Sequence, residues 1–345
     1  MIIDRSILHS YLELLQKCSS SSINEDVSDK IMFHPFCISN ASKGRLLTFI
    51  KCDIDFEGIF VLDTILKIVK AVSGNEINLI FTDDELKISS SKSKLGLKPI
   101  TIENWQSKFI TSPLKFTENK EFKPLPKTFL QALTAVKQCA AGEKNLSILS
   151  NIAIIKNNCI ASDNYRIGYY KLSGKFENDF LLDVYNIDGI LAFNPEEYSL
   201  CEDRIIFKRD EDIQICAINS IGKYPDFLPI LNRDKSSEAI QLPEELKEAV
   251  NVVQQIPGKN DDSQIKIDLA KNKLALSYNT INGWFKRNIR IDYTGTPITF
   301  SMNINVLNDA LRNVGNELLL SEEGTGMMKL ENFKYVFPIE LETQS

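Results

Sequence analysis

The chain has 345 residues and a formal net charge of −6, and 43% of its residues are hydrophobic and 25% charged. This length allows two or three domains of ordinary size, and the composition is typical of a globular protein. The sequence contains no run of about 20 apolar residues, and its first residues lack the basic-then-apolar layout of a signal peptide. We therefore expect a cytoplasmic protein that does not span a membrane.

The cysteines of the chain are odd in number and do not form paired spacings such as CxxC. They are Cys18, Cys37, Cys52, Cys139, Cys159, Cys201 and Cys216. His34 and Cys37 are three residues apart, but two candidate ligands do not make a zinc site. The sequence thus predicts buried free thiols, with no metal and no cofactor.

The first third of the chain begins with a strand-like stretch and an amphipathic helix over residues 6–17. Leu8, Leu12 and Leu15 recur at i, i+4 and i+7, the spacing of one buried helical face. A second short helix is expected over residues 62–72. Residues 76–97 then predict strands separated by an acidic turn.

The second and third parts of the chain repeat this order. Helices are expected over residues 126–139 and 186–193, and again over 243–255 and 303–314. Their first helices carry the same apolar spacing, in Phe129, Leu133 and Val136 and in Leu246, Val250 and Val253. Pro126 and Pro243 occupy positions where a first-turn proline is tolerated. Strands are expected within residues 147–162, 202–224, 266–280 and 316–338.

The repeated order predicts an α+β fold of three similar domains, each with two helices covering one face of a mostly antiparallel sheet. We place the domains at residues 1–120, 121–238 and 239–345, with polar linkers near 115–125 and 232–242. Such a repeat is compatible with simple duplication in an enzyme, or with a curved assembly that has one repeated inner face.

Three segments resemble the bacterial DNA polymerase III beta subunit, the sliding clamp. ASDNYRIG at 161–168 is similar to that family's A-T-D-G-H-R-L-A stretch, and GKYPDFLPIL at 222–231 to its G-x-F-P-D-Y stretch. YVFPIEL at 335–341 is similar to the family's closing V-V-M-P-M-R-L. Each segment alone is a weak signal. Together, in this order and at this spacing inside a threefold repeat, the three segments make a more specific resemblance.

The resemblance implies that each chain forms half of a closed ring around duplex DNA. Such a clamp is a homodimer that tethers the replicative polymerase and repair proteins to DNA, gives processivity and has no catalytic site of its own. A separate clamp loader opens it, and partners bind it through short clamp-binding peptides. The DNA contacts are independent of sequence, and no cofactor is implied.

By the same resemblance, the matched segments converge on an apolar pocket for partner peptides. Its expected residues are Leu149, Ser162, Asn164, Tyr165, Arg166, Ile167, Pro225, Ile230, Leu231, Tyr335, Val336, Phe337, Pro338, Ile339 and Leu341. The alternative is that these apolar residues are ordinary strand core, and that Asp163 and Arg166 form a local ion pair at a turn.

The chain departs from the family pattern at several of these positions. Asn164 replaces a glycine, and asparagine tolerates left-handed backbone better than most residues. Tyr165 replaces a histidine and Glu340 an arginine, while residues 342–345 extend past the usual end. We expect these changes to alter the preferred peptide and to leave the pocket in place.

The resemblance also implies that the helices line the central hole and that the first and third domains meet between subunits. Candidate phosphate contacts are Lys17, Lys67, Lys70, Lys127, Lys137 and Arg312, and candidate interface residues are Leu95, Leu97 and Ile256. Plain solvated surface and core packing explain these residues about as well. The net charge of −6 does not favour DNA binding unless the basic residues share one surface.

An enzyme of another class is the alternative to a clamp. The sequence has no GxxxxGK[ST] loop, no GxSxG elbow and only two histidines, His9 and His34. A carboxylate-dependent hydrolase or nuclease would need its acids gathered into one site. Asp163 and Asp226 are the pair most expected to converge, and we assign both to structural roles.

Overall fold

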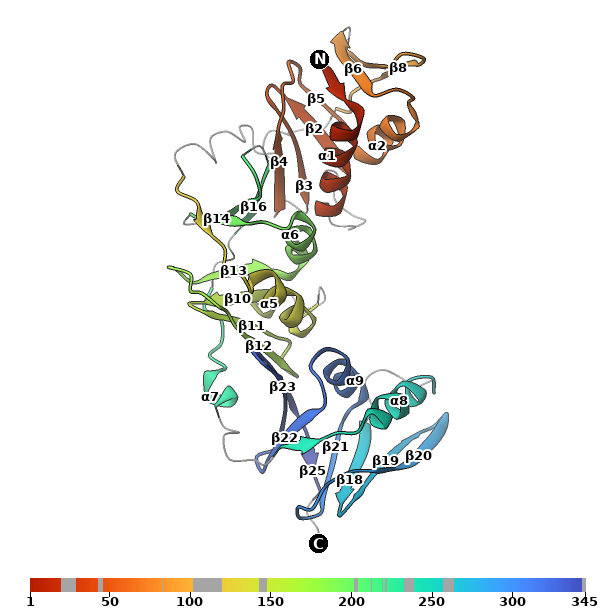
Figure 1. Cartoon of the computed structure of the whole chain (residues 1–345), viewed down its shortest axis with the longest axis vertical. Helices are drawn as coiled ribbons and strands as arrows, with labels where there is room; N and C mark the ends of the chain where they lie inside the picture. The colour runs from red at the N-terminus through yellow and green to blue at the C-terminus, as the bar shows by residue number, and fades with distance from the viewer. Residues whose placement is uncertain are drawn as a thin grey trace. The chain divides into compact units, whose positions relative to one another are not determined.

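The structure is a computed structural model of the whole chain (Figure 1). It describes residues 1–19, 29–42, 46–82, 84–101, 120–142, 148–201, 204–211, 213–218, 220, 222–232, 239–256 and 264–342. The chain divides into two compact units. Unit 1 comprises Met1–Leu130 and Phe180–Ile221, and unit 2 comprises Gln131–Asp179 and Gly222–Ser345.

The described elements follow one order three times: a strand, a helix, four strands, a second helix and three strands. The first repeat consists of β1 (Ile2–Asp4), α1 (Arg5–Cys18), β2 (Lys30–His34), β3 (Cys37–Ser42), β4 (Leu46–Lys51), β5 (Gly58–Val61), α2 (Leu62–Ala71), β6 (Glu76–Thr82), β7 (Glu85–Ser89) and β8 (Lys94–Leu97). This order agrees with the repetition predicted from the sequence.

The second repeat has the same order, with short 3-10 turns beside its helices. It consists of β9 (Lys123–Pro124), α5 (Phe129–Val136), η1 (Lys137–Cys139), η2 (Ile148–Ser150), β10 (Asn151–Ile155), β11 (Asn158–Ser162), β12 (Ile167–Lys171), β13 (Phe180–Asp183), η3 (Val184–Asn186), α6 (Ile187–Phe193), β14 (Glu197–Leu200), β15 (Arg204–Lys208) and β16 (Ile213–Ile218). A short helix, α7 (Leu228–Leu231), follows it.

The third repeat adds one terminal strand to the pattern. It consists of β17 (Ile240–Gln241), α8 (Glu244–Val253), β18 (Gln264–Ala270), β19 (Lys273–Thr280), β20 (Gly283–Arg290), β21 (Ile298–Asn303), α9 (Ile304–Asn313), β22 (Glu317–Ser321), β23 (Thr325–Leu330), β24 (Phe333–Pro338) and β25 (Glu340–Leu341). Parts of the predicted linkers, residues 115–119 and 233–238, lie outside the described residues. The domain boundaries stay a prediction.

The helices form where apolar spacing predicts them, because each buries one face. All nine residues of the predicted i, i+4, i+7 sets are buried. Asp4 caps α1 by accepting from the backbone N–H groups of Ser6 and Ile7, and Asn303 caps α9 in the same way. The predicted helix 126–139 is shorter than expected, since α5 begins at Phe129 and its last turn is a 3-10 turn.

Unit 1 contains two sheets, with the strand orders β1-β6-β7-β8 and β5-β2-β3-β4-β16-β15-β14-β9. In the larger sheet, β4 of the first repeat pairs antiparallel with β16 of the second (Figure 1). Helix α1 packs against α2 and α6. Gly189 allows the close approach to α6, because a Cβ there would overlap a Leu46 side-chain methyl and crowd the Cys18 backbone.

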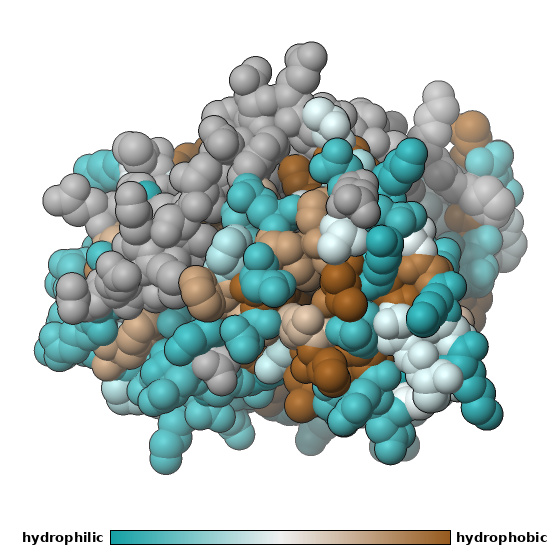
Figure 2. Space-filling view, turned by 90° about the horizontal axis from the view of Figure 1, so that it is seen from above, coloured by the Kyte–Doolittle hydropathy of each residue, from teal (hydrophilic) through white to brown (hydrophobic). Residues whose placement is uncertain are grey.

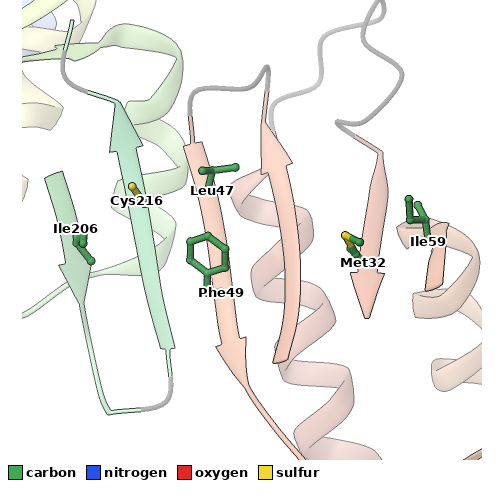
Figure 3. Packing of buried hydrophobic residues seen from close by; sticks show 6 residues of the cluster. All are labelled: Met32, Leu47, Phe49, Ile59, Ile206 and Cys216. Carbon is green, nitrogen blue, oxygen red and sulfur yellow. The ribbon is translucent and has the colours of Figure 1, made fainter. Parts of the chain in front are cut away.

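A hydrophobic cluster covers the sheet face turned away from these helices (Figure 3). Its buried members come from five strands and are Met32, Leu47, Phe49, Ile59, Ile206 and Cys216. Phe122 and Cys201 pack against it. Strand side chains alternate between faces, and Leu46, Ile50 and Ile215 are buried on the opposite face, so both faces of the joint between β4 and β16 are largely apolar.

In unit 2, strands β10-β11-β12-β24-β23-β22-β17 follow one another in one sheet, and a second sheet has the order β20-β19-β18-β21-β25. Here β12 of the second repeat pairs antiparallel with β24 of the third. The two internal joints, β4–β16 and β12–β24, therefore use corresponding strands.

The surface of the described residues is mixed in character. On the face drawn in Figure 2, hydrophilic residues surround a hydrophobic patch near its centre. None of the helices in the described part of the chain is long and apolar enough to cross a bilayer.

Candidate functional site

The turn between β11 and β12 organises the first segment of the site. The Asp163 carboxylate accepts from the backbone N–H groups of Tyr165 and Arg166, both at 3.0 Å. Asn164 has a φ of 74°, as expected for an asparagine in place of glycine. This turn leaves the Tyr165 side chain 72% exposed.

Arg166 connects this turn to two distant elements. Its Nε lies 3.0 Å from Asp163 Oδ2, and its Nη1 pairs with the Asp309 carboxylate on α9. Nη1 also donates to the Tyr335 hydroxyl at 3.2 Å. Burial disfavours the charge, but Tyr335, Asp163 and Asp309 outweigh it and raise the pKa of Arg166. The predicted local ion pair is present, and it belongs to a larger network.

Residues 222–231 approach the same turn from the other side. The Tyr224 hydroxyl accepts from the Ser162 backbone N–H at 3.0 Å, and its ring meets Phe227 edge-on. Burial raises the pKa of Tyr224, so the hydroxyl stays protonated and neutral. The Asp226 carboxylate accepts from the Leu228 N–H at the start of α7 at 3.0 Å. Asp163 and Asp226 thus both act on the backbone, as we assigned them.

The C-terminal strand β24 supplies the third segment. Val336 pairs with Ile167 across the β12–β24 joint, and Tyr335 and Phe337 point to the other face. All four side chains are buried, with Tyr335 at 0% and Phe337 at 1% exposure. Residues so well covered form the inner wall of the site and offer no surface to a partner.

The exposed part of the site comes from neighbouring residues. Pro225, Pro338, Tyr165 and Leu341 are exposed and Ile230 is half-buried. Leu228, which we did not predict, is 40% exposed on α7. Lys334 Nζ donates to the Leu231 carbonyl at 3.4 Å and so links α7 to β24.

The remaining predicted residues have internal roles. Ser162, Leu231 and Ile339 are buried. Leu149 is buried in η2, where its carbonyl accepts from the Ala141 N–H at 3.0 Å. The structure therefore brings the three matched segments together within unit 2, as an apolar inner layer and a mixed outer layer.

Sequence reasoning missed two residues that organise the site, Asp309 and Tyr224. Asp309 lies 143 residues from its partner Arg166, and nothing in its local sequence marks it. Tyr224 directly precedes Pro225 in a matched segment, so the motif itself offered the signal.

The tail beyond the family's usual end begins along β21 and β25. Glu340 pairs with Ser301 across this edge and is exposed. Glu342 forms an ion pair with Lys266 at 2.5 Å, and residues 343–345 lie outside the described residues. Glu340 therefore adds negative charge to this end of unit 2.

The predicted DNA-facing cations differ in their environments. Lys17, Lys70 and Lys127 are exposed, and Lys137 is half-buried in η1. Lys67 pairs with Asp63 on its own helix at 2.6 Å, and Arg312 donates to Asn251 Oδ1 at 3.0 Å. The side chains of Lys67 and Arg312 are thus already engaged within the protein.

The predicted interface residues lie at two sheet edges. Leu95 and Leu97 are on β8, which ends the first sheet of unit 1. Ile256 follows α8, and a Cβ on Gly283 at the start of β20 would touch it. Strand β20 likewise ends its sheet in unit 2.

Solved structures with the same fold cover the whole chain. A putative DNA polymerase III beta subunit from Eubacterium rectale matches with a TM-score of 0.83 at 16% identity, over 98% of each chain. The sliding clamp of Pseudomonas aeruginosa matches with a TM-score of 0.81 at 14% identity, over 100% of this chain and 99% of that chain. The chain has the sliding-clamp fold.

A third sliding-clamp match supports the same conclusion. The pol III beta of Caulobacter crescentus matches with a TM-score of 0.82 at 14% identity, over 98% of each chain. No family model and no curated protein sequence matches the chain. None of these three structures is a hydrolase or a nuclease, so the alternative of a carboxylate enzyme has no support. The α+β clamp fold predicted from the sequence is confirmed.

Proposed function

We propose that the chain is a DNA sliding clamp that closes as a homodimeric ring around duplex DNA and tethers replication proteins to it. The full-length match to sliding-clamp structures is the observation that carries this proposal. A clamp acts as a topological tether, so it needs no catalytic site and no cofactor of its own. A tethered polymerase gains processivity because its effective concentration at the DNA is high.

The sheet topology supports closure by a second copy. Strand β16 of the second repeat pairs with β4, and strand β24 of the third repeat pairs with β12. The corresponding strands that remain are β8, at the edge of the first repeat, and β20, at the edge of the third. Pairing β8 of each copy with β20 of the other would make a closed twofold ring of six repeats.

Leu95, Leu97 and Ile256 are the apolar residues that we assign to this closing joint. Leu95 and Leu97 alternate with exposed positions on β8 and are only half-buried in the single chain. An edge strand with such residues gains stability when a partner strand covers it.

DNA contacts in this proposal are weak and independent of sequence. Lys17, Lys70 and Lys127 are exposed at or near helix ends, where phosphate contacts without base readout are possible. Helix α8 carries Glu244, Glu245 and Glu248 against one lysine, so it adds little attraction for phosphates. Weak attraction suits a ring that must slide, because retention comes from closure.

The site in unit 2 is the proposed docking surface for short peptides of the polymerase, the clamp loader and repair proteins. Tyr165, Pro225, Leu228, Pro338 and Leu341 are exposed there, and the buried wall beneath them holds their backbone in place. The three matched segments converge here, and a glutamine-led peptide that ends in Leu-Phe is the ligand to test.

Two measurements test the ring. Sedimentation equilibrium should give about twice the chain mass of 39.1 kDa at micromolar concentration. Leu95→Asp should shift the protein to the monomer, whereas Ile80→Asp, an exposed apolar residue inside the same sheet, should not. A parent protein that stays monomeric at all concentrations refutes the homodimer.

Retention on circular DNA tests the encirclement. Rings assembled from monomers in the presence of a nicked plasmid should co-elute with the plasmid in gel filtration at high salt. A single cut in the plasmid should release them, since a ring slides off a free end. Equal retention on cut and circular plasmid contradicts topological binding.

A further inference from the structure

Cross-strand partners allow residues to be matched between repeats. The hairpins β2–β3, β10–β11 and β18–β19 each turn through two residues. The first residue after each turn pairs with a basic residue on the next strand, in the matched pairs Cys37–Lys51, Asn158–Lys171 and Lys273–Arg290. Three positions before each basic residue, the equivalent residues are therefore Thr48 on β4, Gly168 on β12 and Arg287 on β20.

Strands β8, β16 and β24 can be matched by starting from the strand that precedes the first helix of each repeat. In β1, β9 and β17, the residues two positions before Asp4, Pro126 and Pro243 pair with Asn78, Glu197 and Glu317. The residue after each of Asn78, Glu197 and Glu317 pairs with a residue on the next strand, which in turn pairs with a residue on β8, β16 or β24. The three series of partners are Leu79–Ile88–Leu95, Tyr198–Phe207–Ile215 and Leu318–Met328–Tyr335. Leu95, Ile215 and Tyr335 are therefore equivalent.

Both internal joints have the same register in these matched positions. Thr48 pairs with Ile215, and Gly168 pairs with Tyr335. If the ring closes as proposed, the same register places Leu95 opposite the partner subunit's Arg287. One step along the antiparallel pair, Gly96 then lies opposite the partner subunit's Lys286.

The matched position at each internal joint is an apolar pair on the face away from the helices. Leu47 pairs with Cys216 and Ile167 with Val336, and all four are buried. At the closing joint, the same position combines a glycine with a lysine. Closure there cannot rest on an apolar contact, so this position requires another source of attraction.

The Glu85 carboxylate lies beside this position. It lies over Gly96, because a Cβ placed on Gly96 would overlap the carboxylate oxygens. Glycine thus leaves the space in which the carboxylate rests beside the strand edge. Glu85 is the only acidic residue of β7 and β8, which also carry Lys87 and Lys94.

We propose that the Glu85 carboxylate, lying over Gly96, binds Lys286 of the partner subunit and sets the register of ring closure. The inference rests on the proposed homodimer and adds the contact that selects its register. Lys94 would lie opposite the partner's Asn288 in this register. Lys87 and Lys94 are the other charged residues of β7 and β8, so among these two strands Glu85 is the residue whose charge is opposite to that of Lys286.

Charge reversal tests the ion pair. Lys286→Glu and Glu85→Lys should each weaken the dimer by roughly 2- to 30-fold in Kd, since the twofold ring contains two such surface pairs. Combining the two substitutions should restore the dimer to within about threefold of the parent. Lys175→Glu makes the same change in net charge as Lys286→Glu, at an exposed position in a loop of the middle repeat, and should have no effect.

Disulfide trapping tests the register independently of the charges. Lys94→Cys combined with Asn288→Cys should give a covalent dimer on mild oxidation, because directly opposite Cβ atoms lie within about 5.5 Å. Lys94→Cys with Lys286→Cys, displaced by two residues, should cross-link far less. The parent protein, oxidised in parallel, controls for the native cysteines.

The outcomes separate this inference from the ring itself. A dimeric parent whose reversed pair is not rescued, or whose displaced cysteines cross-link preferentially, overturns the ion pair and register and leaves the homodimer standing. A parent that is monomeric by sedimentation overturns both.

Discussion

Replacing Phe337 by alanine should separate the buried wall of the candidate site from its surface. Phe337 is 1% exposed, its ring centroid lies 5.9 Å from that of Tyr335, and the ring covers Gly326. Removing a fully buried phenylalanine costs about 3–5 kcal/mol in free energy of unfolding, since neighbours refill the cavity only in part. That loss corresponds to a fall in Tm of roughly 6–20 °C.

Tyr165→Ala is the matched surface change. Tyr165 is 72% exposed, so its loss should change the free energy of unfolding by less than about 0.5 kcal/mol. Peptide affinity should nevertheless fall by roughly 1–3 kcal/mol if the exposed ring anchors the ligand. Phe337→Ala should therefore act mainly on stability, and Tyr165→Ala mainly on peptide affinity.

Urea unfolding and calorimetric titration with a glutamine-led Leu-Phe peptide measure both quantities on the full chain. Phe337→Leu, which keeps most of the volume, should lie between the parent and Phe337→Ala in stability. The reasoning fails if Phe337→Ala unfolds at the same urea concentration as the parent. It also fails if Tyr165→Ala binds the peptide as tightly as the parent does.

Three further changes test the site and the core. Arg166→Ala leaves the Asp309 carboxylate and the Tyr335 hydroxyl without this partner and should cost about 3 kcal/mol in urea unfolding; a cost below about 1 kcal/mol would contradict the network. Asn164→Gly should be neutral, whereas Asn164→Val should cost about 1–2 kcal/mol because φ is 74°, and equal stability of the two variants would argue against a left-handed turn. Burial raises the pKa of Cys18 to about 11, so its thiol binds a proton more tightly in the folded state than in the unfolded state, where the pKa is about 9. Stability should therefore fall by up to about 1.4 kcal/mol per pH unit between pH 9 and 11, and Cys18→Ala should flatten that slope in urea titrations.

The outcome at Tyr335 and Phe337 shows where sequence reasoning about the site was incomplete. Alternation along residues 333–338 places these two side chains on one face, but it does not say which face is covered. Both could have been ligand anchors on that pattern alone. Their burial depends on contacts with segments far away in the chain: β24 pairs with β12, and Arg166 donates to the Tyr335 hydroxyl.

The sequence by itself determined the features that arise from near neighbours. The i, i+4, i+7 spacing of Leu8, Leu12 and Leu15 specifies a helix and its buried face, because both follow from a repeat of 3.6 residues. The tripled order of elements and the left-handed turn at Asn164 are local in the same sense. Such features depend on residues a few positions apart, so a pattern along the chain contains them.

Only the tertiary structure decided the contacts between distant segments. Arg166 meets Asp309 across 143 positions, and the carboxylate of Glu85 covers Gly96 on the neighbouring strand. The register of β4 with β16 and of β12 with β24, from which the closing joint follows, has no local signal. Strand pairing joins segments whose separation the chain does not encode locally, and their order is settled only when the sheet forms and buries its faces.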